Sequence, residues 1–164
     1  MEQNKVSYIW GFLRLGMGWI FFWAFIDKLF GLGFATAPEK AWIAGGSPTF
    51  GFLNFAAKGP FAEFYQGLAG NPIVDWLFMA GLFGIGAALL FGIGVKIASY
   101  SGVLMMLLMY TAGFMPPASN PFLDNHLIYA VVFVGLALSH SGHSLGLGAW
   151  WKNTKLVQKC KILE

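Results

Sequence analysis

Residues 73–93 read IVDWLFMAGLFGIGAALLFGI, and Asp75 is the one charged residue among them. A helix needs roughly 20 mostly apolar residues to cross the hydrocarbon core of a bilayer. This stretch is long and apolar enough, so it predicts a membrane-crossing helix. Small residues recur at every fourth position on one face, namely Ala80, Gly84, Ala88 and Gly92. Such a face predicts close packing against the backbone of another helix.

Three further apolar stretches lie on either side of this one, and we expect them to cross the membrane at about 9–32, 97–115 and 126–145. Hydrophobic residues make up 57% of the chain and charged residues 10%, and the mean hydropathy is +0.65. This composition leaves too little polar surface to coat a soluble globule. The 164 residues therefore predict an all-α fold, an integral membrane four-helix bundle that forms a single domain over 1–164.

The connections between the predicted spans differ in character. The 33–72 loop is long and rich in aromatic residues, so we expect it to fold back onto the bundle as a lid that contains short helices, with a turn at 45–49. The prolines of the 116–121 segment predict a tight turn that makes the last two spans antiparallel neighbours. In the 150–164 tail, apolar residues alternate with lysines at helical spacing, which predicts an amphipathic segment on the inner membrane leaflet.

The positive charges predict the orientation, because Lys and Arg are retained on the cytoplasmic side of a membrane. With the N-terminus inside, three lysines face outward, namely Lys28, Lys40 and Lys58. The other seven basic residues face the cytoplasm, namely Lys5, Arg14, Lys96, Lys152, Lys155, Lys159 and Lys161. This asymmetry predicts that both termini are cytoplasmic. We expect a multi-pass protein of a prokaryotic plasma membrane, surrounded by membrane lipids.

Cysteine usage and charge distribution exclude several classes of function. Cys160 is the single cysteine, so the chain contains no internal disulfide and no thiol pair for redox chemistry. The basic residues are scattered rather than clustered with aromatic residues, which argues against nucleic-acid binding. His140 and His143 are close enough in sequence to share a ligand, but no third ligand is apparent, so we predict no metal site.

Ionisable residues inside apolar spans are the candidate functional residues, because each needs a partner or a watery cavity. Five of them fall near the outer membrane face on three different spans, namely Asp27, Lys28, Asp75, Asp124 and His126. One interpretation is a shared polar pocket. The other is that Asp27 and Lys28 are interfacial and that Asp124 caps the last span ahead of His126.

A second group lies toward the cytoplasmic face, where Arg14 on the first span and His140 on the last are expected at similar depth. His140 is a candidate catalytic residue, or it interacts with the negative end of a helix dipole. Our candidate catalytic residues are Asp27, His126 and His140. Our candidate substrate-binding residues are Arg14, Lys28, Asp75 and Asp124.

Five motifs occur in an order that resembles the DoxX/DoxD family of small membrane proteins. They are RLG at 14–16, WAFIDKL at 23–29, GSPT at 46–49, NPFLDNHLIY at 120–129 and GLGAWW at 146–151. The resemblance covers nearly the whole chain. It implies the membrane subunit of a thiosulfate:quinone oxidoreductase, which oxidises thiosulfate to tetrathionate, reduces a quinone and needs a second protein subunit.

Within that resemblance, the outer lysines are expected to attract the thiosulfate dianion, and a quinone is expected to enter laterally between helices. His126 or Asp27 would relay protons. No iron-ligating set or flavin fingerprint is present, so electrons would come from a partner.

Two other functions stay open. The first is a non-catalytic membrane scaffold, or a lipid- or quinone-binding protein, that recruits a soluble redox partner. The chain could also form a homo-oligomer. The second is a proton-coupled transporter of small solutes that uses Asp27 and His126.

Overall fold

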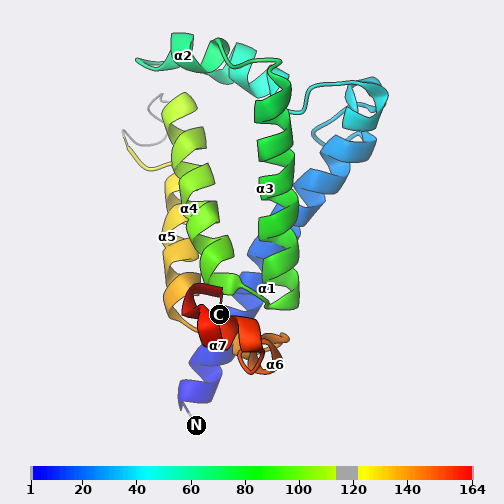
Figure 1. The fold of residues 1–164 in the computed structure, drawn as a ribbon. Helices are drawn as coiled ribbons and strands as arrows, with labels where there is room; N and C mark the ends of the chain where they lie inside the picture. The colour runs from blue at the N-terminus through cyan, green and yellow to red at the C-terminus, as the bar shows by residue number, and fades with distance from the viewer. Residues whose placement is uncertain (1, 114–121, 164) are drawn as a thin grey trace.

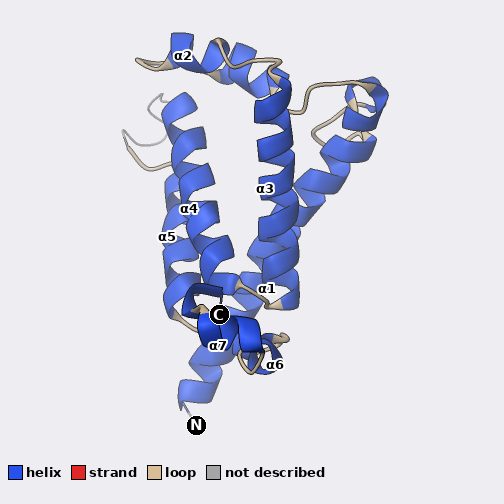
Figure 2. Ribbon diagram, viewed as in Figure 1, coloured by secondary structure: helices blue, strands red, loops and turns tan. Residues whose placement is uncertain are grey.

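The computed structural model describes residues 2–113 and 122–163, and their side chains from residue 5 onward. This part of the chain consists of helices and connecting loops and contains no strand, which confirms the predicted helical fold (Figure 2). The bundle consists of α1 (Glu2–Phe30), α3 (Pro72–Phe91), α4 (Val95–Ala112) and α5 (Asn125–Leu138) (Figure 1).

Three of the bundle helices are long and apolar enough to cross a membrane, namely Lys5–Phe30, Pro72–Phe91 and Val95–Ala112. These ranges lie close to three of the predicted spans. The fourth prediction is wrong at its end, because α5 stops at Leu138 instead of residue 145. His140 follows with a left-handed backbone (φ +48°), which a continuing helix does not tolerate. The 14 residues of α5 extend about 21 Å, short of the roughly 30 Å of a bilayer core.

Local sequence signals account for the other helix ends. Asn71 caps α3 by accepting the N–H of Ile73 at 2.9 Å, and Pro72 occupies the first helical position, where its missing N–H costs nothing. Gly92 ends α3 and Gly94 precedes α4, both with positive φ. These two glycines allow the tight reversal that makes α3 and α4 antiparallel.

The bundle consists of two closely packed helix pairs. In the pair formed by α1 and α3, a Cβ atom at Gly86 would lie 2.6 Å from the backbone nitrogen of Phe22, so only glycine permits this approach. In the pair formed by α4 and α5, the ring of Phe133 fills the space over Gly102. Phe21 of the first pair meets Phe133 of the second with ring centroids 5.2 Å apart, at the centre of the buried core. The predicted antiparallel packing of the last two spans is confirmed.

The small residues of α3 do not produce the close helix packing that their spacing predicts. Ala80, Gly84 and Ala88 line an open groove of about 250 Å³ between α3 and α4. A Cβ at Gly84 would meet no atom within 4 Å. The close approach of α1 depends instead on Gly86, which lies on another face of the helix.

The 33–72 connection forms a lid at one end of the bundle, as predicted (Figure 1). It contains four short helices, namely η1 (Pro38–Lys40), η2 (Trp42–Ala44), η3 (Phe52–Ala56) and α2 (Ala62–Gln66). Trp42 packs against Trp76 of α3 with ring centroids 4.5 Å apart. Tyr65 hydrogen-bonds Thr111 of α4 at 2.7 Å, so the lid is attached to both helix pairs. We call the end of the bundle that the lid covers the lid end.

Both chain termini lie at the opposite end, which we call the terminal end (Figure 1). Four short helices gather there, namely η4 (Ser141–His143), α6 (Gly148–Trp151), α7 (Lys155–Lys159) and η5 (Lys161–Leu163). The indole of Trp151 donates to the carbonyl of Leu163 at 2.6 Å, and Val157 is buried. The predicted tail is therefore helical and folds against the bundle. The predicted turn at 116–121 lies outside the described residues.

Candidate functional site

Arg14 is completely buried in the middle of α1, near the terminal end of the bundle. Its guanidinium has five N–H groups, and five hydrogen bonds to backbone carbonyls use them all. The acceptors belong to Leu89, Leu90, Ser141, Ser144 and Leu145. No donor remains for a substrate, so this geometry favours a structural role for Arg14.

The carbonyls that Arg14 binds explain why a charge lies buried there. The last carbonyls of a helix have no partner within the helix, and Leu89 and Leu90 belong to the final turn of α3. Gly92 and Gly146 lie beside the guanidinium, where a Cβ would come within 3.2 Å and 2.9 Å of its nitrogens. Arg14 therefore joins α1, the end of α3 and the segment after α5.

Asp27 is 2% exposed near the lid end of α1. Its two carboxylate oxygens accept the backbone N–H groups of Phe34 at 3.2 Å and Ala35 at 3.0 Å. These bonds hold the chain as it leaves α1, so the carboxylate stabilises a turn. The proposed proton-relay role of Asp27 stays a prediction.

Asp75 is 6% exposed in the first turn of α3, where it binds the lid. Its Oδ1 accepts hydrogen bonds from the hydroxyl of Ser47 at 2.9 Å, and from the backbone N–H and hydroxyl of Thr49 at 3.2 Å and 2.5 Å. The Ser47 hydroxyl also accepts the N–H of Phe50, as expected for a turn in this segment. Asp75 thus anchors the lid to α3.

Asp124 and His126 form an ion pair, with 2.6 Å between Oδ2 and Nδ1. The other oxygen of Asp124 accepts the N–H of Leu127, which makes Asp124 the N-cap of α5, as one interpretation of the sequence held. Burial alone would raise the pKa of Asp124, but the hydrogen bonds from His126 and Leu127 hold it below its ordinary value. The two side chains are 25% and 29% exposed, so both reach the surface.

Lys28 is half-buried beside Asp27, and no hydrogen bond or ion pair engages its ammonium within the described residues. The ends of α1, α3 and α5 place all five outer candidates at the lid end. The carboxylates there bind three separate segments. Asp27 accepts hydrogen bonds from the backbone of residues 34–35, Asp75 accepts them from residues 47–49, and Asp124 caps α5. A shared pocket of all five residues therefore stays a prediction.

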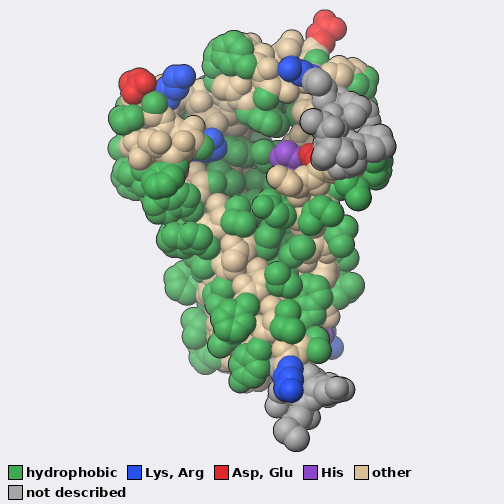
Figure 3. All heavy atoms as spheres, turned by 180° about the vertical axis from the view of Figure 1, so that it is seen from behind, with side chains coloured by type: hydrophobic (Ala, Val, Ile, Leu, Met, Phe, Trp, Pro, Cys, Tyr) green, Lys and Arg blue, Asp and Glu red, His purple; other side chains and the backbone are tan. Residues whose placement is uncertain are grey.

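A hollow opens beneath the lid on the side of the molecule away from the view of Figure 1. Figure 3 shows histidine and acidic side chains on one side of this hollow and a basic side chain on the other. The Asp124–His126 pair lies at the same end of the bundle as the lid, and both of its side chains are partly exposed.

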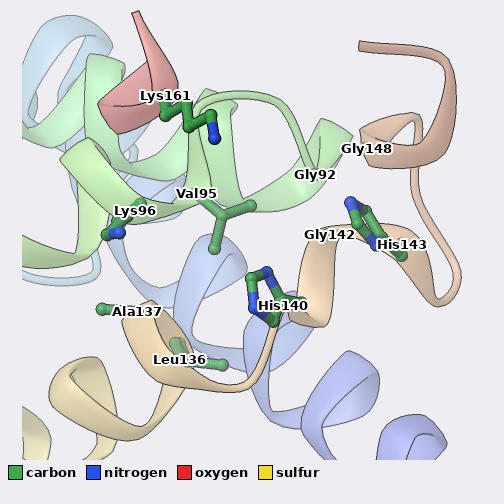
Figure 4. A pocket seen from close by; sticks show the side chains of 10 residues that line it. All are labelled: Gly92, Val95, Lys96, Leu136, Ala137, His140, Gly142, His143, Gly148 and Lys161. Atoms are coloured by element: carbon green, nitrogen blue, oxygen red, sulfur yellow. The ribbon is translucent and has the colours of Figure 1, made fainter. Parts of the chain in front are cut away.

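His140 lies at the opposite end of the molecule from His126. It is exposed, and its ring stacks on that of His143 with centroids 5.9 Å apart. Both rings line a cavity of about 30 Å³ with Lys96 and Lys161 (Figure 4). Arg14 reaches the same region, since its Nε donates to the carbonyl of Ser141 next to His140. The expected similar depth of Arg14 and His140 agrees with this contact.

Several polar contacts had no clear signal in the sequence. Ser47 and Thr49 were noted as turn residues and as part of the GSPT motif, and neither observation indicated that they attach the lid to Asp75. Lys96 and Lys161 were counted only as topology signals, yet they lie beside one cavity with two histidines. The described residues contain no group of three His, Cys, Asp or Glu side chains suited to a metal ion.

Comparison of the chain with known protein families, with curated proteins and with solved structures finds no match.

Proposed function

We propose that the chain is a multi-pass protein of a prokaryotic plasma membrane, with all four bundle helices crossing and both termini in the cytoplasm. Three helices have the required length and apolarity. Large apolar side chains are exposed along the sides of the bundle, such as Phe12, Leu77 and Val131, while the charged side chains gather at its ends (Figure 3). A soluble protein rarely exposes so continuous an apolar surface.

The short α5 is compatible with a fourth crossing because of Arg14. Irregular backbone is tolerated at membrane depth only where protein satisfies its polar groups. The carbonyls of Ser141, Ser144 and Leu145 follow α5 and bind the guanidinium. These three carbonyls of the segment after α5 therefore have protein partners, as an irregular extension of the crossing requires. The larger number of basic residues at the terminal end supports a cytoplasmic position for that end.

Within this membrane protein, the lid end is proposed to bind the headgroup of a quinone, as part of an oxidoreductase that takes electrons from thiosulfate. The observation that carries the proposal is the Asp124–His126 pair at the lid end, where both side chains are partly exposed. Reduction of a quinone consumes two electrons and two protons, and oxidation of two thiosulfates to tetrathionate supplies the two electrons. The resemblance to the DoxX/DoxD family supports this pairing of substrates.

Each residue of the proposed site has a stated task. Asp124 fixes the orientation and tautomer of the His126 ring through Nδ1, so that Nε2 exchanges protons with a quinone oxygen. Lys28 supplies positive charge for an anionic substrate or for the developing quinol oxyanion. A second subunit carries the electrons, because the side chains described here include no electron-carrying group.

A non-catalytic lipid- or quinone-binding scaffold is the second candidate. It is favoured by the hydrogen bonds of Arg14, Asp27 and Asp75, whose charged groups are all engaged by the chain itself. Buried polar groups with complete hydrogen bonding serve the fold well without any catalytic role.

The test is thiosulfate-dependent quinone reduction in native membranes, where the partner subunit is present. His126→Gln keeps a polar side chain but does not titrate, and Lys28→Gln removes the charge. We expect His126→Gln to lower turnover about 100-fold, a usual contribution of one acid–base group, and Lys28→Gln to lower it about 100-fold through the loss of charge stabilisation. Lys155→Gln, on the exposed face of α7, is the matched control.

Melting temperatures of all three variants show whether the fold survives. Wild-type turnover in His126→Gln would contradict the proton-relay role. A wild-type complex inert toward thiosulfate would favour the scaffold.

A further inference from the structure

The lid is attached to the two helix pairs in different ways. Its chain leaves α1 at Phe30 and enters α3 at Pro72, so both of its ends are covalently continuous with the first pair. Its attachment to α4, in the second pair, is non-covalent. Figure 1 shows the lid extending from the end of α3 across to the end of α4.

The side of the lid over α1 and α3 is held by charged and aromatic groups. Asp75 accepts hydrogen bonds from residues 47–49, and Asp27 accepts the N–H groups of residues 34–35. Hydrogen bonds to a charged group are roughly twice as strong as those between neutral groups. Trp42 adds an aromatic contact with α3. We call this the fixed side of the lid.

The side over α4 is held by two hydrogen bonds between neutral groups, which we call the latch. The hydroxyls of Tyr65 and Thr111 are 2.7 Å apart, and the backbone N–H of Lys58 donates to the carbonyl of Ala112 at 2.9 Å. The Thr111 hydroxyl hydrogen is directed to two carbonyls of its own helix, at 3.0 Å each. Tyr65 is therefore the donor in the first bond of the latch, because a hydroxyl has one hydrogen to donate.

Two features of the backbone bound the segment that carries the latch. The short helix η3 (Phe52–Ala56) is a π-helical turn, in which the N–H of Ala57 binds the carbonyl of Phe52 five residues earlier at 3.1 Å. Such turns are rare and frequently lie at functional sites. Gly70, beyond the other end of α2, has φ +77°, which glycine adopts without a steric penalty. Residues 57–69 thus lie between two points where the backbone departs from regular helix.

We propose that the lid is a gate that stays attached to α1 and α3 and opens on its α4 side, where breaking the latch uncovers the hollow beneath the lid. The weaker bonds make this the side that opens first. Ala57 and Ala112 lie next to the latch and are 2% and 1% exposed, so opening exposes both. The opening itself does not depend on quinone reduction. Only its use, to admit a quinone headgroup at the lid end, rests on the proposed function.

The experiment measures how fast a buried cysteine reacts with a water-soluble disulfide reagent in the purified, folded chain. A buried thiol reacts only while its surroundings are open, so the rate reports how often they open. In a Cys160→Ser background, Ala57→Cys reports on the α4 side of the lid. Ala41→Cys reports on the fixed side, since Ala41 is also 2% exposed and lies against the end of α1. We expect Ala57→Cys to react faster, and Ala112→Cys replaces it as reporter if that variant does not fold.

Tyr65→Phe tests the latch, because it removes the hydroxyl and keeps the ring. We expect it to make Ala57→Cys react about fivefold faster, the effect of one neutral hydrogen bond, and Ala41→Cys less than about twofold faster. Thr111→Val should match Tyr65→Phe, and the two together should add little, since both remove the same bond. Thr111→Ser keeps the hydroxyl and is the matched control.

Two results would overturn the proposal. One is equal acceleration of both reporters by Tyr65→Phe, which would show that the whole lid opens as one unit. The other is an unchanged rate at Ala57→Cys in that variant, which would show that the Tyr65 bond does not hold the lid closed. Both results are measured without turnover, so failure of the redox proposal is distinguishable from failure of the gate.

Discussion

The Nη1 atom of Arg14 donates to the carbonyl oxygen of Leu89, so a charge in the first bundle helix closes the last turn of the second. A second N–H of the same nitrogen binds the carbonyl of Leu90, and the other three N–H groups of the guanidinium bind the segment that follows the fourth helix. One side chain thereby holds two segments that lie 75 to 131 residues further along the chain. The predictions below begin with this relationship.

Arg14→Ala should destabilise the protein by about 3 kcal/mol or more, because each buried carbonyl left unpaired costs about 1–3 kcal/mol. Arg14→Lys should recover only part of the loss, since an ammonium has three donors in place of five. Thermal unfolding in one detergent measures both. Lys28→Ala is the control, because no hydrogen bond or ion pair engages that ammonium within the described residues. Equal melting temperatures of Arg14→Ala and wild type would show that these hydrogen bonds add nothing.

Thr49→Val should loosen the lid with little effect on the bundle. It removes the hydroxyl that donates to Asp75 at 2.5 Å and leaves the valine isostere in its place. A hydrogen bond to a charged group contributes about 1.5–3 kcal/mol, so local opening should become at least tenfold more frequent. Hydrogen exchange of residues 50–57 measures this opening. Thr154→Val, which removes a cap of α7 far from the lid, should leave exchange in 50–57 unchanged.

Stability should depend on the protonation of Asp124. Its pKa is below the ordinary value in the folded protein, so the carboxylate contributes stability that is complete above the unfolded pKa of about 3.9. That contribution disappears as pH falls through the folded pKa. The melting-temperature difference between wild type and Asp124→Asn should therefore be constant from pH 7 to pH 5 and shrink toward zero below pH 4. If the melting-temperature difference persists unchanged at acid pH, the destabilisation by Asp124→Asn comes from the shape of the side chain rather than from its charge.

The proposed orientation predicts that Cys160 is labelled by an impermeant thiol reagent only after the cells are lysed. Cys160 is exposed, so lack of access through burial is not an alternative explanation. In a cysteine-free background, Glu63→Cys on exposed α2 should react in intact cells. Gly46 is unsuitable for this purpose, because a Cβ there would lie 2.2 Å from the carbonyl oxygen of Lys40. Labelling of Cys160 from outside would reverse the topology.

Hydropathy located α1, α3 and α4, because a helix of about 20 apolar residues needs no tertiary contact to be recognised. Turn residues and aromatic composition predicted the lid, and the cap of α5 by Asp124 was one of two interpretations, since turn residues and N-caps act over a few positions. The end of α5 was placed too late, although the polar residues 139–144, Ser-His-Ser-Gly-His-Ser, follow Leu138 directly. The tertiary structure alone shows that carbonyls of this segment bind Arg14, which lies 131 residues from Leu145.

The small residues of α3 and the charged residues also show which features the sequence predicts and which depend on the tertiary structure. Periodicity placed Ala80, Gly84 and Ala88 on one face, but which helix approaches which face is a property of the whole bundle, and α1 packs at Gly86 instead. Sequence also indicated which ionisable residues sit near each end. Whether a carboxylate closes a turn, as Asp27 does, or pairs with a histidine, as Asp124 does, depended on the loop backbone that reaches it. Hydrogen bonds need atoms within about 3 Å, and only the folded chain brings distant segments that close.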